Sequence, residues 1–289
     1  MNAMNRRMLP MVLLSCFFVF LLHASAQAVT IGGTPSDGDE DASGLTAMFA
    51  GDRFESFRNM DRFVPTSTMP ASPNPWKLGE NLDSLEYEGE FHGKDVALRE
   101  FIALSDTSAF VVIKEGKVLF EHYAHGDSRE SLHTSFSVAK SFTSALVGIA
   151  LGEGKISSLS DPIRKYLPEL TNKSFDGVTI RHILQMSSGL RFNENYIDPK
   201  SDINKMVGMV PPMTYLEYIN TLEREHEPGT YNHYASINTQ LLGILLSRVT
   251  GESITDYMTR KLWHPVGMER KGLWTLDPTG NELTMGGLA

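Results

Sequence analysis

Residues 135–152 read SFSVAKSFTSALVGIALG, and this stretch decides which fold the rest of the chain must support. Apolar side chains recur in it at helical spacing, at Val138, Phe142, Leu146 and Ile149. This period predicts a helix that buries one face, and Gly152 ends the run. Ser137 and Lys140 lie three residues apart at its start, so the helix places a hydroxyl within reach of an amine.

A hairpin is predicted before this helix. Residues 109–113 and 118–123 are rich in β-branched and aromatic side chains. Residues 114–117 supply the turn, in which Gly116 can take a positive φ. No segment after residue 123 is predicted as a good strand. A two-stranded sheet is not stable alone, so we expect sequence beyond Ala289 to complete it.

Helices are predicted for much of the remainder, over residues 180–186, 215–222, 237–249 and 254–262. Thr179 caps the first helix, which Gly189 closes, and Gly251 closes the third. Ser253, followed by Asp256, forms a capping box for the fourth. The chain therefore reads as a hairpin followed by a largely helical region.

The composition is that of a globular protein, with 41% hydrophobic and 21% charged residues among 289. A chain of this length forms one large domain or two interleaved subdomains. Residues 29–44 are rich in Gly, Ser and acidic residues, which predicts a flexible leader. Prolines between residues 65 and 75 mark an extended segment that we expect to wrap over the surface of the domain, which then occupies residues 76–289.

The first 28 residues have the layout of a secretory signal peptide. Arg6 and Arg7 form a basic start, residues 8–22 are apolar, and small residues allow cleavage after Ala26 or Ala28. A membrane anchor needs about 20 apolar residues, and this run is shorter. The sequence therefore predicts an exported protein, periplasmic or secreted, with no stable membrane anchor after cleavage.

Cys16 is the only cysteine, and its lipidation is left open by the sequence. After cleavage no cysteine remains, which excludes disulfides, a thiol nucleophile and a cysteine metal site. Loss of Arg6 and Arg7 leaves 24 basic against 35 acidic residues, a net charge of −11. Such a charge argues against nucleic acid or an anionic membrane as a partner.

The Ser137–Lys140 pair can carry nucleophilic catalysis. A lysine held neutral by burial takes the serine proton, and the N–H groups of a helix start favour the developing negative charge. The pair alone is weak, since average composition yields roughly one chance Ser-x-x-Lys in a chain this long. A capping serine beside a surface lysine is the alternative. Residues 148–155 lack phosphate-loop spacing, and neither Gly-x-Ser-x-Gly nor His-Glu-x-x-His occurs.

Several sequence blocks strengthen the pair. They are residues 134–170, which contain it, 179–190 (TIRHILQMSSGL), 228–243 (PGTYNHYASINTQLLG) and 262–268 (LWHPVGM). In this order they resemble the serine β-lactamase and penicillin-recognising superfamily. NMDRFVPT at 59–66, the Tyr-Ala-Ser block at 234–236 and GNELTMGGL at 280–288 resemble its 6-aminohexanoate-dimer hydrolase and esterase group. The resemblance implies a β-lactamase/transpeptidase-like α/β fold, an antiparallel sheet flanked by helices with a helical subdomain.

The resemblance also implies roles for single residues. Ser137 is the acylated nucleophile and Lys140 its base. Tyr234 passes protons to the leaving group, as a phenol can if a nearby lysine lowers its pKa. Ser236 stands where many relatives have Asn and is assigned to substrate binding, as is Tyr196, which resembles a tyrosine of a substrate-closing loop. No metal and no cofactor are implied.

The superfamily has a third motif, Lys-Thr-Gly or His-x-Gly, on a strand that also supplies one N–H group of the oxyanion hole. The sequence stops at Ala289 before such a motif. We therefore expect a C-terminally truncated fragment or a degenerate gene, with weak or no activity, because losing one oxyanion donor costs about 10²–10³ in rate.

The sequence thus predicts hydrolysis of a small linear amide or ester through an acyl-enzyme on Ser137. Two alternatives stay open. One is a class C-like β-lactamase or D-alanyl-D-alanine carboxypeptidase, and the other is a non-catalytic binding module that keeps the fold. The sequence specifies neither the natural substrate nor the oligomeric state.

Overall fold

The computed structural model describes residues 52–82, 85, 87–207 and 213–289. The predicted signal peptide, Cys16 and the predicted leader at residues 29–44 lie outside the described residues. Within the described ranges, no helix is long and apolar enough to cross a membrane.

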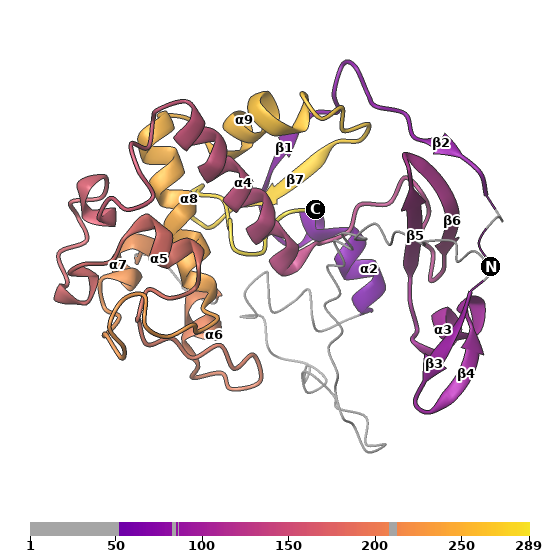
Figure 1. Cartoon of the computed structure of the whole chain (residues 1–289), viewed down its shortest axis with the longest axis horizontal. Helices are drawn as coiled ribbons and strands as arrows, with labels where there is room; N and C mark the ends of the chain where they lie inside the picture. Colours follow the sequence, from indigo (N-terminus) through magenta and orange to yellow (C-terminus); the bar gives the residue numbers. More distant parts are fainter. Residues whose placement is uncertain (1–51, 83–84, 86, 208–212) are drawn as a thin grey trace, which may run out of the picture. The chain divides into compact units, whose positions relative to one another are not determined.

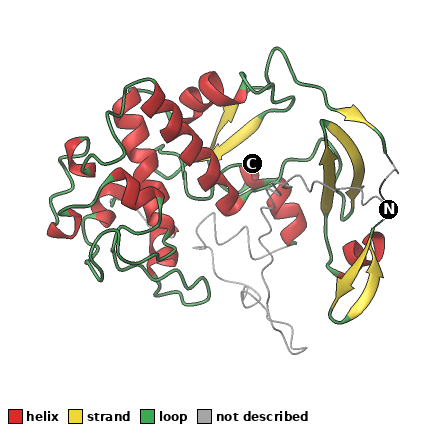
Figure 2. Ribbon diagram, viewed as in Figure 1, coloured by secondary structure: helices red, strands yellow, loops and turns green. Residues whose placement is uncertain are grey.

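Helices and strands of the described residues are drawn in Figures 1 and 2. The α-helices are α2 (Arg53–Arg58), α3 (Leu98–Leu104), α4 (Ala139–Gly152), α5 (Ile180–Leu184), α6 (Asp202–Val207), α7 (Tyr215–Ile219), α8 (Ser236–Thr250) and α9 (Ile254–Met258). The short helical turns are η1 (Met60–Arg62), η2 (Phe136–Val138), η3 (Ile163–Lys165), η4 (Lys173–Phe175) and η5 (Thr259–Trp263). The strands are β1 (Thr66–Met69), β2 (Gly79–Glu80), β3 (Glu88–Phe91), β4 (Lys94–Ala97), β5 (Ala109–Lys114), β6 (Lys117–Tyr123) and β7 (Gly272–Thr275).

The predicted hairpin is confirmed as β5 and β6, which pair antiparallel with Ala109 opposite Tyr123. Its turn places Glu115 at φ 52° and Gly116 at φ 72°. This left-handed pair is the backbone that a tight hairpin turn needs, and glycine adopts it without steric cost. β2 adds to β6 in parallel, which gives a three-stranded sheet in the order β2-β6-β5.

The expectation that no strand follows residue 123 is wrong. β7 pairs antiparallel with β1, with Ser67 opposite Trp274, and the two arrows lie side by side in Figure 1. All four residues of β7 are buried, so the strand lacks the alternation that would have revealed it. The proline-marked segment therefore does not simply wrap over the surface: it supplies β1, whose Met69 is completely buried.

Helix ends follow the predicted capping residues. Thr179 and His182 form a capping box at α5, and Gly251 ends α8 at φ 72°. Ser253 caps α9 by accepting from Asp256 N, but the Asp256 carboxylate accepts from the Ser253 hydroxyl at 2.8 Å instead of reaching the backbone. The helix predicted over residues 254–262 is split, because η5 continues α9 as a wider π turn.

The core is built where α4 packs against α8, helices that Figure 1 draws next to each other. Leu146, Val147 and Ala150 of α4 are completely buried, as are Leu245 and Leu246 of α8. Burying a leucine or valine side chain stabilises a fold by about 1.5–3 kcal/mol. Of the four apolar residues that predicted this helix, Leu146 is completely buried, Phe142 and Ile149 are partly buried, and Val138 is exposed, so the buried face is rotated from the predicted one.

Gly243 of α8 lets the C-terminal segment approach both helices. A Cβ at this position would collide with the Thr284 side chain. The Thr284 hydroxyl donates to Thr239 O of α8 at 3.1 Å, and its carbonyl accepts from Thr143 Oγ1 of α4, also at 3.1 Å. Thr284 thus fixes residues 282–288 against the first turns of α4 and α8.

Candidate active site

Ser137 lies in the turn η2, directly before α4. The preceding residue, Phe136, has φ 45°, a left-handed conformation that costs a bulky residue about 1–3 kcal/mol. The surroundings hold this turn in place: the Phe136 ring meets Phe57 edge-on at 5.1 Å, and Ser135 N donates to Leu288 O at 2.7 Å. The backbone strain beside Ser137 is therefore maintained by contacts from both ends of the described chain.

Lys140 makes the contact that its spacing predicted. Its Nζ lies 2.9 Å from Ser137 Oγ and 2.6 Å from Met285 O. Burial lowers the pKa of Lys140 to about 8, while the carboxylate of Glu194 acts in the opposite direction. The contacts with Ser137 Oγ and Met285 O hold the amine of Lys140 beside the serine hydroxyl, and its pKa lies close to neutral pH.

Tyr234 lies at the same place, with Lys140 Nζ 5.2 Å from the centroid of its ring. Burial raises the pKa of its phenol, although a hydrogen bond with Ser137 opposes the shift, and Glu194 raises the pKa further. The expectation that a nearby lysine lowers this pKa is therefore wrong. Tyr234 keeps its proton at neutral pH, which suits a donor better than a phenolate base.

Ser236 and Tyr196 meet on one carboxylate. Ser236, the first residue of α8, is buried and donates its N–H to Glu194 Oε2 at 2.9 Å and its hydroxyl to Glu194 Oε1. Tyr196 is 53% exposed and donates its hydroxyl to the same Oε1 at 2.6 Å. The roles in substrate binding predicted for both residues remain predictions, as do the catalytic roles of Ser137, Lys140 and Tyr234.

Sequence reasoning missed two groups of this site. Glu194 lies two residues before Tyr196, and an acid in that block was the available signal. Met285 contributes a backbone oxygen, which leaves no mark in the pattern of side chains. In the described residues there is no group of three or more His, Cys, Asp or Glu side chains that could hold a metal ion.

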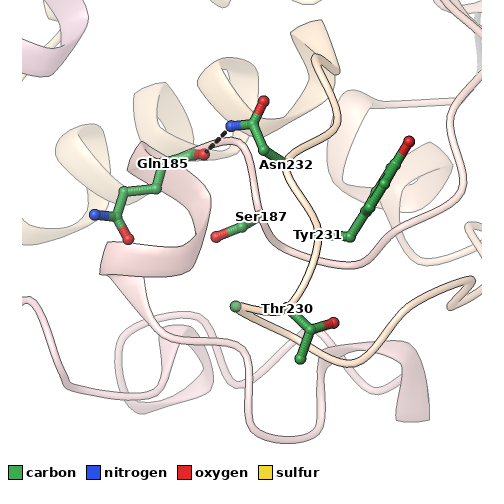
Figure 3. Close-up of a pocket in the computed structure, with 6 residues that line it drawn as sticks. Gln185, Ser187, Thr230, Tyr231 and Asn232 are labelled. Carbon is green, nitrogen blue, oxygen red and sulfur yellow. Dashed lines mark hydrogen bonds between the residues drawn. The ribbon is translucent and has the colours of Figure 1, made fainter.

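A polar cleft of about 540 Å³ opens beside the segment that leads into Tyr234. Figure 3 shows Gln185 and Ser187 on one wall and Thr230, Tyr231 and Asn232 on the facing loop, where Asn232 Nδ2 donates to Gln185 O at 2.8 Å. Neither Ser137 nor Lys140 lines this cleft, so it is separate from the serine–lysine contact.

Comparison with known proteins identifies the family to which the chain belongs. The β-lactamase family model matches residues 103–287, and the chain belongs to that family. The predicted resemblance to the serine β-lactamase and transpeptidase-like superfamily and the predicted mixed helix-and-strand fold are thereby confirmed.

Two curated relatives illustrate the range of the family. The chain is 31% identical over 192 residues to a 6-aminohexanoate-dimer hydrolase of Paenarthrobacter ureafaciens, a match covering 63% of this chain and 48% of the relative. It is 28% identical over 184 residues to a β-lactamase of Escherichia coli K12, covering 60% and 45%. The chain thus spans about half the length of the curated relatives it matches.

A solved structure shares the fold. It is a Bacillus anthracis protein assigned as a 6-aminohexanoate-dimer hydrolase, with a TM-score of 0.74 at 23% identity. The superposition covers 82% of this chain and 66% of that one. At this identity the likeness supports the architecture of helices and strands alone.

Proposed function

We propose that the protein is a serine hydrolase that cleaves a linear amide or ester through an acyl-enzyme on Ser137. The carrying observation is the 2.9 Å contact between Lys140 Nζ and Ser137 Oγ, where burial lowers the pKa of the lysine to about 8. An ordinary lysine keeps its proton to a pH of about 10, whereas about a tenth of this amine is neutral at pH 7. A base is therefore available beside the nucleophile.

The acylation half follows from the contacts of Lys140. Met285 O accepts one N–H of the neutral Lys140 amine. The nitrogen lone pair of Lys140 can then face Ser137 Oγ and remove the hydroxyl proton. Oγ then forms a bond to the substrate carbonyl carbon, and the π electrons move to the carbonyl oxygen. The positive end of the α4 dipole, which no side chain of the N-cap residue neutralises, favours that negative charge.

Release of the leaving group needs a proton donor. Because the raised pKa of Tyr234 keeps its phenol protonated, Tyr234 gives its proton as the C–N or C–O bond breaks, and the ammonium of Lys140 restores it. Water next attacks the acyl-enzyme and gives a proton to Lys140. Ser137 Oγ leaves the acyl carbon and takes that proton, which returns the site to its starting state.

The substrate class rests on the Paenarthrobacter ureafaciens relative, whose name specifies hydrolysis of a 6-aminohexanoate dimer, a linear amide. The Escherichia coli relative supports a β-lactamase or carboxypeptidase as the second candidate. The serine at position 236, where many relatives have Asn, counts against this second candidate.

Covalent labelling tests the proposal. A fluorophosphonate probe should add its mass to the peptide that carries Ser137, and Ser137→Ala should remove the label without changing the thermal unfolding midpoint. A folded protein that stays unlabelled would contradict the hydrolase and favour a non-catalytic module. Turnover of 6-aminohexanoate dimer or a short-chain nitrophenyl ester, compared with nitrocefin, then separates the two substrate classes.

Export is proposed on the basic, apolar and small-residue layout of residues 1–28. Expression in a bacterial host should yield a periplasmic or secreted protein that begins at Gln27 or Val29. N-terminal sequencing that finds Met1 on all of the folded protein would overturn this part of the proposal.

A further inference from the structure

The carboxylate of Glu194 joins two parts of the site that are 42 residues apart in sequence. It accepts from the backbone N–H and the hydroxyl of Ser236, and also from the Tyr196 hydroxyl. Hydrogen bonds to an ionised acceptor are about twice as strong as neutral ones. Three of them on one side chain make Glu194 a fixed point between the loop of Tyr196 and the start of α8.

Helix α8 needs an acceptor at its start. The residue before it, Ala235, has no polar side chain, and no side-chain hydrogen bond caps the helix from that position. Glu194 supplies an acceptor from a distant loop, and its negative charge lies at the positive end of the helix dipole. The first turn of this 15-residue helix is therefore held by Glu194.

The same contact fixes the backbone on one side of Tyr234. Ser236 is anchored by Glu194, and on the other side His233 N donates to Met186 O at 2.8 Å. Ala235, between Tyr234 and Ser236, is buried. With both flanks held, the partly exposed ring of Tyr234 keeps its place beside Lys140 Nζ.

The loop that carries Glu194 is itself tied down. Asn204 of α6 donates its Nδ2 to Tyr196 O at 2.9 Å and to Asp198 O at 2.8 Å, and Asn193 N donates to Asp202 Oδ2 at 2.7 Å. The loop that presents the carboxylate is thus held by residues of α6.

We infer that Glu194 is a positioning residue of the Ser137 site: its carboxylate holds the start of α8 so that Tyr234 faces Lys140, and its charge acts on that lysine. The inference rests on the proposed function. The charge effect is separate from the hydrogen bonds, because the negative charge of Glu194 raises the pKa of Lys140 through space, against the lowering that burial causes. One substitution therefore has two separable consequences, one for the geometry and one for the pH dependence.

Glu194→Gln tests both consequences by removing the charge while keeping the shape. Without the carboxylate the pKa of Lys140 falls further, so neutral base is available at lower pH. The acid limb of the fluorophosphonate labelling rate on Ser137 should move to lower pH. The plateau rate should fall roughly 10-fold, since a 1 Å misplacement can cost about 10²-fold.

Glu223→Gln is the matched control, because Glu223 is 77% exposed and pairs only with Arg191 among the charged contacts of the described residues. It should leave the limb and the plateau unchanged. A merely structural Glu194 would lower the thermal unfolding midpoint without moving the limb. If the labelling rate of Glu194→Gln has the same acid limb and the same plateau as that of the wild type, the inference is overturned.

Glu194→Asp keeps the charge but withdraws the carboxylate by one methylene. It should retain the wild-type acid limb and lower the plateau about 3-fold or more, and it decides the geometric part if Glu194→Gln does not fold. A wild-type plateau in this variant would refute the positioning role. If the wild-type protein does not label at Ser137, the proposed hydrolase function is contradicted. If both variants label with the wild-type acid limb and plateau rate, only the role of Glu194 is contradicted.

Discussion

Two helices begin at the candidate site, α4 beside Ser137 and α8 beside Tyr234, and their first turns are treated differently. Neither has a side-chain cap from its own N-cap residue. The start of α8 receives the carboxylate of Glu194 and is electrostatically satisfied within the protein. Among the described residues no carboxylate is seen to accept from the start of α4, which lies next to Ser137. One helix start is held by a carboxylate of the protein, and the other, in the function that we propose, favours the charge that develops on the substrate.

The largest expected effect comes from removing Lys140, the base that we propose at the start of α4. Lys140→Met should lower the labelling rate at Ser137 by about 10²–10⁴ at pH 8, because a proton transfer is lost. The wild-type rate should rise with pH and level off above the pKa of Lys140, about 8. A stopped-flow or quenched labelling profile from pH 6 to 10 checks both, and a flat wild-type profile would contradict the role of Lys140.

The same variant has a stability consequence whose sign follows from linkage. The folded protein lowers the pKa of Lys140 below its unfolded value of 10.5, so the unfolded chain binds more protons and stability rises with pH between about 8 and 10.5. Lys140→Met removes this penalty. Its free energy of unfolding at pH 7 should exceed that of the wild type by about 3 kcal/mol, because folding lowers the pKa of Lys140 from 10.5 to about 8, and the excess should shrink toward pH 10.5. Urea denaturation at several pH values measures it.

Removing the donor at α8 should have a smaller effect. Tyr234→Phe keeps the ring but deletes the proton that we assign to the leaving group, so hydrolysis of an amide should slow by roughly 10²-fold. An activated ester, whose leaving group needs no proton, should lose much less. Equal losses on both substrates, measured as kcat, would contradict the donor role.

The junction between the two helices can be strained directly. Gly243→Ala would push a Cβ into the Thr284 side chain, which ties α8 to α4. Overpacking of this kind costs about 1–3 kcal/mol, so the thermal unfolding midpoint should fall by several degrees. Gly148→Ala is the control, since a Cβ on Gly148 of α4 meets nothing within 4 Å. A drop of equal size in both variants would show that helix geometry, not Thr284, sets the cost.

The smallest effect is expected at Ser236. Ser236→Ala deletes one of the three hydrogen bonds on Glu194 and keeps the backbone N–H bond and the charge. Stability should fall by about 1 kcal/mol, with little change in the pH profile. If Ser236 contacts substrate instead, KM should rise while stability stays the same, and steady-state kinetics beside thermal melts distinguish the two.

What the sequence predicted well is local. The β5–β6 turn depends on Gly116, and the Ser137–Lys140 contact depends on a spacing of three along one helix. What it missed requires the folded chain: β7 is a short, fully buried strand whose partner β1 lies about 200 residues earlier. The contact of Glu194 with α8 exists only in the folded chain, where the loop of Glu194 lies against the start of that helix. The pKa of Tyr234 was expected to fall but is raised, chiefly by burial, which is a tertiary property.

The oxygen that orients Lys140 belongs to the backbone of Met285, and this shapes which mutations the site tolerates. Replacing Met285 by leucine exchanges a side chain of similar volume and leaves the oxygen where it is. At Gly287, two residues on, a Cβ would lie 2.9 Å from carbons of both Leu283 and Thr275 and would shift the backbone that carries that oxygen. A deep mutational scan would therefore find the functional constraint displaced from the residue in contact to a neighbouring glycine that touches no reacting atom.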